Sequence, residues 1–464
     1  MERPRLNYDV LLLVLGFSDK PTLACLMQTC RELYRPATTH ILQGVVTLTL
    51  VPSRILSLSS FLLTDSLQRM PHLRKLEISD APWSRPDRDL IIDSDSASSL
   101  NHLLQRLAVA GYLEELILYE LDDVLYGYPH ISDTIESFTS LQSIQIFEAG
   151  EPSESLLANL ESCLVSATIS FEQFRTIPDH VFRNPVPLLS HSRNTLRRLY
   201  LLRARLEYLS DDLDNEVTYP NVTDLILVHT DVLDISRYIS AFPRLQRLET
   251  TECNDYWPRQ MDLSTREDNE EAQKQSGTWP KLDVYDGSLL SLWQIAIACP
   301  ISSLKLTHDD LGEVPPTMAI DVLTAGRPVN LELRVRGCRV FLTDEVLRIF
   351  RHSMESLSDL QSLRLDLDLA HGDSEEDWNN VLDSMVSNIL APLPSLSSFE
   401  LNIKAPMGTR RTSPDDTVQS HEVSERSPSP LLQHVADWDQ TAFIERACGS
   451  SRNGTLEEVK IVKP

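Results

Sequence analysis

L-R-K-L-E-I at residues 73–78 is one of the clearest copies of a pattern that recurs through most of this 464-residue chain. In each copy an apolar residue is followed three and five positions later by two others, as in L-E-E-L-I-L at 113–118 and L-Q-S-L-R-L at 360–365. The fourteen copies lie 22 to 60 residues apart, about 32 on average, which indicates a repeat array. They start at Val45, Leu73, Leu113, Leu141, Leu164, Leu196, Val222, Leu245, Trp279, Ile301, Pro328, Leu360, Leu396 and Leu456.

The spacing within each copy predicts a short strand, because residues two apart point to the same face of a strand. A return to the next parallel strand needs a crossover of a dozen or more residues, which is usually helical. We therefore expect an α/β fold, an irregular solenoid over residues 45–464 with parallel strands on its concave face and helices on its convex face. The helix-like segments between copies are 53–70, 99–110, 155–165, 232–242, 344–357 and 378–390.

Two stretches of the array are polar and predict insertions. Residues 252–280 are acidic with few apolar anchors, and residues 404–430 are rich in Ser, Pro, Thr and charge. We expect both to be loops, the second of them disordered. Ser413, Ser427 and Ser429 each precede a proline there, so they are candidate phosphorylation sites or simply part of a Ser/Pro-rich linker.

Residues 1–44 form a separate helical segment in this prediction. Asn7 is a plausible N-cap, Pro21 suits the first turn of a second helix, and Thr29 and Glu32 fit a capping box that starts a third. Pro36 is expected to break or restart that third helix. Since so short a segment cannot bury all its apolar side chains alone, it needs a partner surface, either the rest of the chain or another protein.

The N-terminal segment resembles an F-box of the kind found in fungal F-box/leucine-rich-repeat proteins. The resemblance is carried by Leu6, Asp9-Val10-Leu11, Val14-Leu15-Gly16-Phe17, Thr22-Leu23, Leu26-Met27 and Thr29-Cys30-Arg31-Glu32-Leu33-Tyr34. It covers about 40 residues, and Asn7 stands where the family usually has the proline of an opening Leu-Pro pair. The repeats that follow match the usual architecture of that family.

The resemblance implies a non-enzymatic substrate-recognition adaptor of a cullin–RING ubiquitin ligase. A Skp-family adaptor would bind the F-box helices and link the chain to a cullin, while the repeats hold an unknown protein target near the ubiquitin-charged enzyme. The adaptor interface, or the small core behind it, would consist of Leu6, Val10, Leu11, Val14, Leu23, Leu26, Met27, Cys30 and Leu33. Two alternatives stay open: a cap that closes the solenoid edge of a protein-interaction scaffold without a role in ubiquitination, and an adaptor-bound scaffold that acts outside degradation.

Outward-facing strand residues of the first half of the array suggest where a target binds. They are apolar and aromatic there and become charged in the later repeats, as at Lys305, Glu332 and Arg364. If the repeats stack regularly, one contiguous exposed patch results, which is a mark of a binding surface. We predict that this substrate-binding patch contains Ile117, Tyr119, Phe147, Tyr200, Leu202, Ile226 and Val228.

Charge and cysteine usage restrict the partners. The net charge is −26; residues 1–44 carry five basic and four acidic residues, so the remainder carries 37 basic and 64 acidic residues, a balance of −27. Phosphate binding needs a positive face, so neither nucleic acid nor an anionic membrane is expected as a ligand.

The seven cysteines are widely spaced without a C-x-x-C pair, and no apolar run reaches about 20 residues. We expect a cytoplasmic or nuclear protein without zinc, disulfides or a membrane helix.

No catalytic residue, metal site or cofactor is predicted. The sequence contains none of the H-E-x-x-H, G-x-S-x-G, Walker or dinucleotide-binding motifs. An acidic cluster superficially suggests calcium but lacks the Gly and the terminal Glu of an EF-hand loop, so we expect a solvated acidic loop. Its members are Asp366, Asp368, Asp373, Glu375, Glu376 and Asp377.

Overall fold

A computed structural model describes most of the chain, and its contacts divide it into two compact units. Unit 1 comprises residues 1–230 and 240–244, and unit 2 comprises residues 231–239 and 245–464. The structure describes residues 7–29, 31–79, 92–171, 184–204, 206, 217–230, 232, 234–251, 263–370, 373, 378–404, 440–450, 456 and 458–462.

Fourteen described strands follow one another in chain order, and every described pairing within each unit is parallel. Each strand lies at one of the fourteen motif copies, so the predicted repeat positions are confirmed. The register predicted from Trp279 is wrong, because Tyr285 and not Val284 takes the buried position of β9 opposite Leu248 and Leu304. Unit 1 holds β1 Val46–Thr49, β2 Lys75–Ser79, β3 Glu115–Tyr119, β4 Ser143–Ala149, β5 Ser166–Phe171, β6 Arg198–Leu202 and β7 Asp224–Val228. Unit 2 holds β8 Arg247–Thr251, β9 Leu282–Gly287, β10 Ile301–Leu306, β11 Asn330–Arg336, β12 Ser362–Asp368, β13 Ser398–Lys404 and β14 Glu458–Val462.

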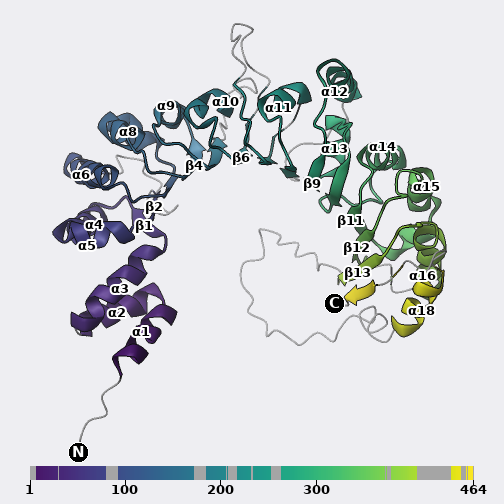
Figure 1. The fold of residues 1–464 in the computed structure, drawn as a ribbon, viewed down its shortest axis with the longest axis horizontal. Helices are drawn as coiled ribbons and strands as arrows, with labels where there is room; N and C mark the ends of the chain where they lie inside the picture. Colours follow the sequence, from purple (N-terminus) through teal and green to yellow (C-terminus); the bar gives the residue numbers. More distant parts are fainter. Residues whose placement is uncertain are drawn as a thin grey trace, which may run out of the picture. The chain divides into compact units, whose positions relative to one another are not determined.

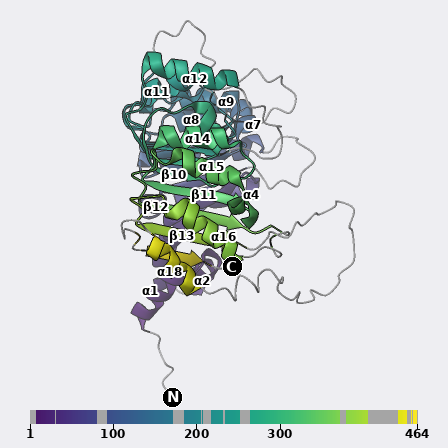
Figure 2. The same ribbon diagram turned by 90° about the vertical axis from the view of Figure 1, so that its right-hand side faces the viewer.

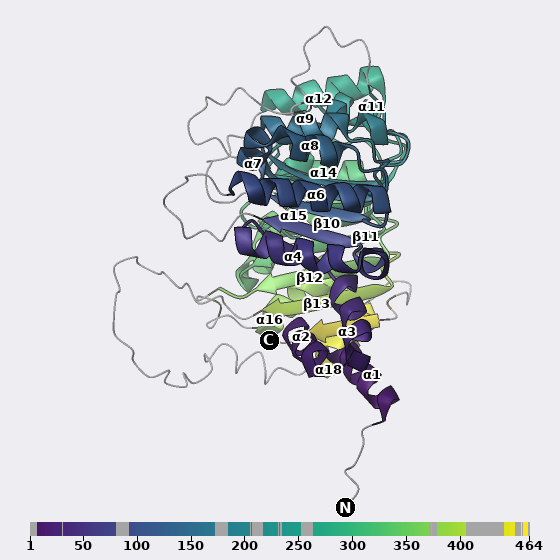
Figure 3. The same ribbon diagram turned by 90° about the vertical axis from the view of Figure 1, so that its left-hand side faces the viewer.

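Helices occupy the crossovers of unit 1 and cover one face of its strands, as Figures 1 and 3 show for α4, α6, α8 and α9. Neighbouring helices pack on one another in chain order, α4 on α6, α6 on α8 and α8 on α9. The helices after β1 are α4 Pro52–Thr64, α5 Ser66–Arg69, the 3-10 helix η1 Met70–His72, α6 Ser94–Ala110, α7 Asp122–Gly127, α8 Pro129–Glu136, α9 Glu151–Asn159, α10 Pro185–Leu188 and η2 Ser190–Ser192.

Unit 2 repeats this arrangement, with α14, α15 and α16 stacked beside the strands in Figure 2. The helix α11 (Ile235–Ala241) follows β7 in the chain. The further helices are α12 Leu263–Ser276, α13 Leu289–Ile295, α14 Pro316–Gly326, η3 Cys338–Leu342, α15 Asp344–Ser353, α16 Trp378–Met385, the π-helical turn η5 Val386–Leu390 and α18 Gln440–Ser450. All six helices predicted from the sequence are therefore confirmed, with shifted ends.

The alternation of inward and outward side chains along each strand explains which residues form the core. The motif leucines Leu116 and Leu118 of β3 are fully buried, as are Leu363 and Leu365 of β12. They face the helix layer, so each repeat buries its apolar edge against its neighbours. The residues between them form the opposite face, which no described helix covers (Figure 1).

The helix α12 corrects the prediction of a loop over residues 252–280. It carries almost no apolar side chains, yet it docks through two buried amides, Asn269 and Gln273. Asn269 accepts the backbone N–H of Ile235 at 2.8 Å and donates to the carbonyl of Gln294 at 3.0 Å. Gln273 donates to the carbonyl of Ala296 at 2.8 Å. Paired amides can be buried without loss of stability, so this helix needs no apolar stripe. Residues 252–262 and 405–430 of the two predicted insertions lie outside the described residues.

Three helices precede β1, as expected: α1 Tyr8–Phe17, α2 Lys20–Thr29 and α3 Arg31–Gln43. Asn7 caps α1 by accepting the N–H of Asp9 at 3.1 Å. The expectation that Pro36 interrupts the third helix is wrong, since α3 runs through it. Buried neighbours on both sides of the proline, among them Leu33 and Ala37, hold the helix together there.

The buried Arg69 joins these helices to the first repeat. Its guanidinium lies 4.5 Å from the ring centroid of Phe61 on α4 and 5.6 Å from that of Tyr34 on α3. It also donates to the hydroxyl of Tyr34 at 2.9 Å and to the carbonyl of Phe61. One side chain therefore contacts both elements, which fixes the N-terminal helices on the first repeat of unit 1.

Candidate functional site

The helix α1 is apolar on two faces, although it packs through only one of them. Leu15 is buried in a small core with Leu23 and Leu33, and Leu11 and Leu12 pack against that core. The opposite face presents a stripe at positions i, i+3, i+4 and i+7, which share one side of a helix. This exposed stripe consists of Val10, Leu13, Val14 and Phe17, which are 44%, 62%, 43% and 91% exposed.

The structure separates two roles that the sequence left combined among the nine predicted adaptor-binding residues. Val10 and Val14 belong to the exposed stripe. Leu23 and Leu33 are buried in the core, and Leu11, Leu26 and Met27 pack partly buried against it. Leu6 and Cys30 lie outside the described residues. The sequence interpretation left Leu13 and Phe17 out of the predicted site, although their helical spacing from Val10 places them on its face.

The open face of unit 1 carries the residues predicted to bind a target. Register pairs Tyr119 with Phe147 across β3 and β4, and Leu202 with Val228 across β6 and β7. Two residues earlier on the same two strands, Tyr200 lies opposite Ile226. All six are half-buried side chains of the face opposite the helices. We call them the apolar patch.

Two details of the predicted patch need correction. Ile117 is only 7% exposed, because Gln145 of β4 and Glu77 of β2 flank it in register. The patch is also not contiguous, because the half-buried Thr168 and the buried Ser170 of β5 lie between its two halves. An aromatic half on β3 and β4 is thus separated from an aliphatic half on β6 and β7.

A left-handed residue lies at or near the carboxyl end of four of these strands. The residue after the last patch position takes positive φ in each case: Glu120 (50°), Glu148 (59°), Arg203 (59°) and His229 (51°). This conformation costs a non-glycine residue about 1–2 kcal/mol. Such strain tends to persist at binding and active sites, which draws attention to this edge of the sheet.

The charges along that edge are partly paired. Arg203 Nη1 lies 3.4 Å from Glu148 Oε1 and 3.4 Å from the carbonyl oxygen of Phe171. Since Glu148 belongs to β4 and Arg203 follows β6, the ion pair spans β5 between the two halves of the patch. Burial, and secondarily the charge of Arg203, lowers the pKa of the His229 imidazole. This lowering favours the neutral form of His229.

The open face of unit 2 is a ladder of paired charges instead. In-register neighbours run from Glu249 through Asp286, Lys305, Glu332, Arg364 and Glu400 to Lys460. The ion pairs include Arg364–Glu332 at 3.4 Å, Lys460–Glu400 at 3.0 Å and Arg334–Asp368 at 2.6 Å. Opposite charges that face each other across strands stabilise the sheet and satisfy one another. This surface offers a target less unpaired or apolar area than the face of unit 1.

The acidic cluster begins within β12, and its described members differ from the predicted solvated loop. Glu375, Glu376 and Asp377 lie outside the described residues. Asp366 is only 5% exposed and is bound by Lys404 and Arg364. Asp373 is buried, and it accepts the N–H groups of Cys338 at 3.1 Å and Ala370 at 2.8 Å. Both carboxylates are therefore structural. Among the described residues no group of three potential ligands is arranged to hold a metal ion.

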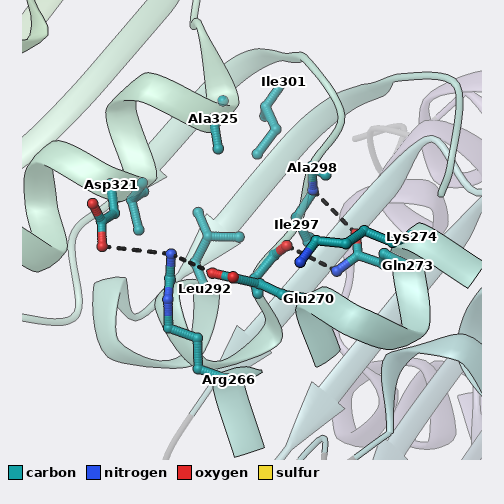
Figure 4. Close-up of a pocket in the computed structure, with 13 residues that line it drawn as sticks. Arg266, Glu270, Gln273, Lys274, Leu292, Ile297, Ala298, Ile301, Asp321 and Ala325 are labelled. Carbon is teal, nitrogen blue, oxygen red and sulfur yellow. Dashed lines mark hydrogen bonds and ion pairs between the residues drawn. The ribbon is translucent and has the colours of Figure 1, made fainter. Parts of the chain in front are cut away.

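One pocket of about 430 Å³ lies between α12, α13 and α14 of unit 2 (Figure 4). It opens where the short α13 ends, above Leu292 and Ile297. Arg266 on its wall is paired with Glu270 at 2.9 Å and with Asp321 at 3.4 Å (Figure 4). Its thirteen lining residues include no Ser, Cys or His, so the lining supplies none of the usual nucleophile–base pairs.

Comparison with known proteins gives no assignment, since no protein-family model and no curated protein matches this chain. Within the described residues, none of the helices has the length and apolar character needed to span a membrane.

Proposed function

We propose that this chain is the substrate-recognition adaptor of a Skp–cullin–F-box ubiquitin ligase. In this proposal the three N-terminal helices bind a Skp-family adaptor, which links them to a cullin. The solenoid of unit 1 holds a protein target on its open face. The chain itself performs no chemistry and acts by raising the local concentration of the target.

The exposed stripe of α1 is the single observation that carries this proposal. Four apolar side chains on one helix face are exposed to solvent, although Leu11, Leu12 and Leu15 of the same helix pack in or against a core. Exposed apolar stripes of this kind mark helix-in-groove and helix–helix docking. The stripe lies on the first helix of the segment that resembles an F-box.

The Arg69 junction supports a second role for the same helices. Its contacts with Tyr34 and Phe61 seat α3 against the first repeat, as a cap on a solenoid would require. A cap needs no exposed apolar stripe on α1, whereas an adaptor-binding module does. The two roles are compatible, and a cap-only scaffold predicts that the stripe is dispensable.

Co-precipitation of the adaptor and the cullin tests the proposal. Substitutions such as Leu11→Arg and Leu26→Arg would disturb folding, because both residues pack against the small core. Leu13→Arg with Phe17→Arg alters only exposed positions, and Val109→Arg on α6, at a residue 84% exposed, is the matched control. We expect the double variant to lose adaptor and cullin together while the control keeps both. Equal recovery with the double variant would favour the cap-only scaffold.

A further inference from the structure

A glutamate directly follows the aromatic half of the apolar patch in the sequence. Tyr119 and Phe147 stack with their ring centroids 4.5 Å apart. Glu120 directly follows Tyr119, and its N–H donates to the carbonyl of Phe147 at 3.1 Å. The Glu120 side chain is exposed, and no described residue pairs with its carboxylate. The two rings and the exposed Glu120 therefore occur at the same end of β3 and β4.

The chain itself shows what such a combination binds. Arg74 lies over the ring of Tyr112 at 5.5 Å and pairs with Glu114 at 2.7 Å. In unit 2, Arg266 lies over the ring of Trp293 at 4.6 Å and pairs with Glu270 at 2.9 Å. In both places a guanidinium satisfies an aromatic face and a carboxylate at once.

We infer that Tyr119, Phe147 and Glu120 form a subsite for an arginine side chain of the target protein. The inference rests on the proposed function of the open face of unit 1 as a target-binding surface. Arginine suits this subsite better than lysine, because its planar guanidinium stacks on rings and is more weakly hydrated than an ammonium group.

The electrostatics of the chain favour the same ligand. The net charge of −26 attracts a basic segment over a long range. Close to the patch, Glu148 is neutralised by Arg203, so Glu120 is the charge left for a ligand along this edge. A basic residue of the target would pair with Glu120 as Arg203 pairs with Glu148.

The position of the aliphatic half predicts a second feature of the ligand. Phe147 lies on β4 and Leu202 on β6, two strand spacings apart, which is about 10 Å. An extended segment that crosses the strands advances about 3.3 Å per residue. Side chains on one face of such a segment lie two or four positions apart, so the expected ligand carries an apolar residue two or four positions from its arginine.

The backbone at Glu120 provides a test that separates side-chain function from structure. Glycine takes positive φ without strain, so Glu120→Gly removes the carboxylate and relieves the backbone at the same time. If the Glu120 side chain had only a structural role, this substitution would lower the stability of the protein. The inferred subsite predicts an unchanged or raised melting temperature together with weaker peptide binding.

Selection of random 12-residue peptides displayed on phage against the full chain supplies the probes. We expect enriched peptides to contain arginine. Replacement of that arginine by uncharged citrulline, and Glu120→Gln in the chain, should each weaken binding about 10-fold, and the two together should add little more. Glu161→Gln, at an exposed acid of unit 1 outside the patch, should bind as the parent chain does.

The outcomes separate this inference from the proposed function. Enriched peptides without a basic residue, or equal binding by parent and Glu120→Gln, would overturn the arginine subsite. If such peptides still lost binding with Leu202→Asp and Val228→Asp, the open face would remain the target site. If no selected peptide responded to any change in the patch, both the subsite and the proposed face would be rejected.

Discussion

The rings of Tyr119 and Phe147 lie parallel to within 6°, with centroids 4.5 Å apart, on adjacent strands of unit 1. The in-register parallel pairing of β3 and β4 places the two residues side by side. Both belong to the face that no described helix covers. Two large rings left half-exposed there stabilise each other and also form a surface that a partner can cover.

A double-mutant cycle at this pair measures the stacking energy. Tyr119→Ala and Phe147→Ala should each lower the free energy of unfolding, with a coupling energy of about 0.5–1.5 kcal/mol. Urea denaturation of the two single variants and the double variant gives this number. A coupling near zero would mean that the rings do not support each other in solution.

Loss of Arg69 should loosen the N-terminal helices. Arg69→Met keeps much of the side-chain volume but leaves the Phe61 carbonyl and the Tyr34 hydroxyl without their donor. We expect a loss of about 2–4 kcal/mol in the free energy of unfolding and faster proteolysis of residues 7–43. The control Tyr34→Phe removes one hydrogen bond and should cost about 0.5–1.5 kcal/mol. Equal stability of Arg69→Met and the parent would exclude the junction.

The buried amides of α12 should matter more than its exposed polar residues. Asn269→Ala leaves the N–H of Ile235 and the carbonyl of Gln294 unpaired, so it should destabilise unit 2 by about 2–4 kcal/mol. Gln275→Ala on the exposed face of the same helix should change stability by less than about 0.5 kcal/mol. Thermal or urea unfolding distinguishes them. Similar effects of the two variants would show that α12 is not held by its amides.

Acid should weaken the ion pairs that Asp366 makes with Lys404 and Arg364 on the open face of unit 2. Burial alone would raise the pKa of this carboxyl, but the hydrogen bonds and charges of Lys404 and Arg364 outweigh burial and lower it. A lowered pKa in the folded state gives stability that is present above the unfolded value near pH 4 and is lost as pH falls through the folded value. From pH 5 to pH 3 the parent should therefore lose more stability than Asp366→Asn. Parallel pH profiles of the two would contradict this assignment.

The strands were predictable because their signal is local. Leu73, Leu76 and Ile78 are spaced so that alternate residues reach the core, and the same spacing located even the weak copy at Pro328. At Trp279 it located the strand but not its register, because Tyr285 and not Val284 is buried there. The helix α12 was missed because its anchors, Asn269 and Gln273, are polar and leave no apolar period. Their role depends on carbonyl groups at the end of α13, whose proximity cannot be read from the sequence.

The candidate sites were predictable only in part. The residues of α1 are apolar all round, so the sequence could not distinguish Leu15 in the core from Leu13 and Phe17 at the surface. Only the packing of α2 and α3 decides between those faces. The charged ends of the strands were missed because Glu120 and His229 occupy left-handed positions where glycine would be the usual signal.

Direct binding of a purified Skp-family adaptor to the full chain tests the central proposal most directly. In a calorimetric titration the parent chain and the Val109→Arg control should bind with one-to-one stoichiometry, and Leu13→Arg with Phe17→Arg should weaken binding at least about 100-fold. The circular dichroism spectrum and melting temperature of the double variant should match those of the parent, since both positions are exposed. No binding by the parent, or equal binding by the double variant, would contradict the proposed adaptor role of α1.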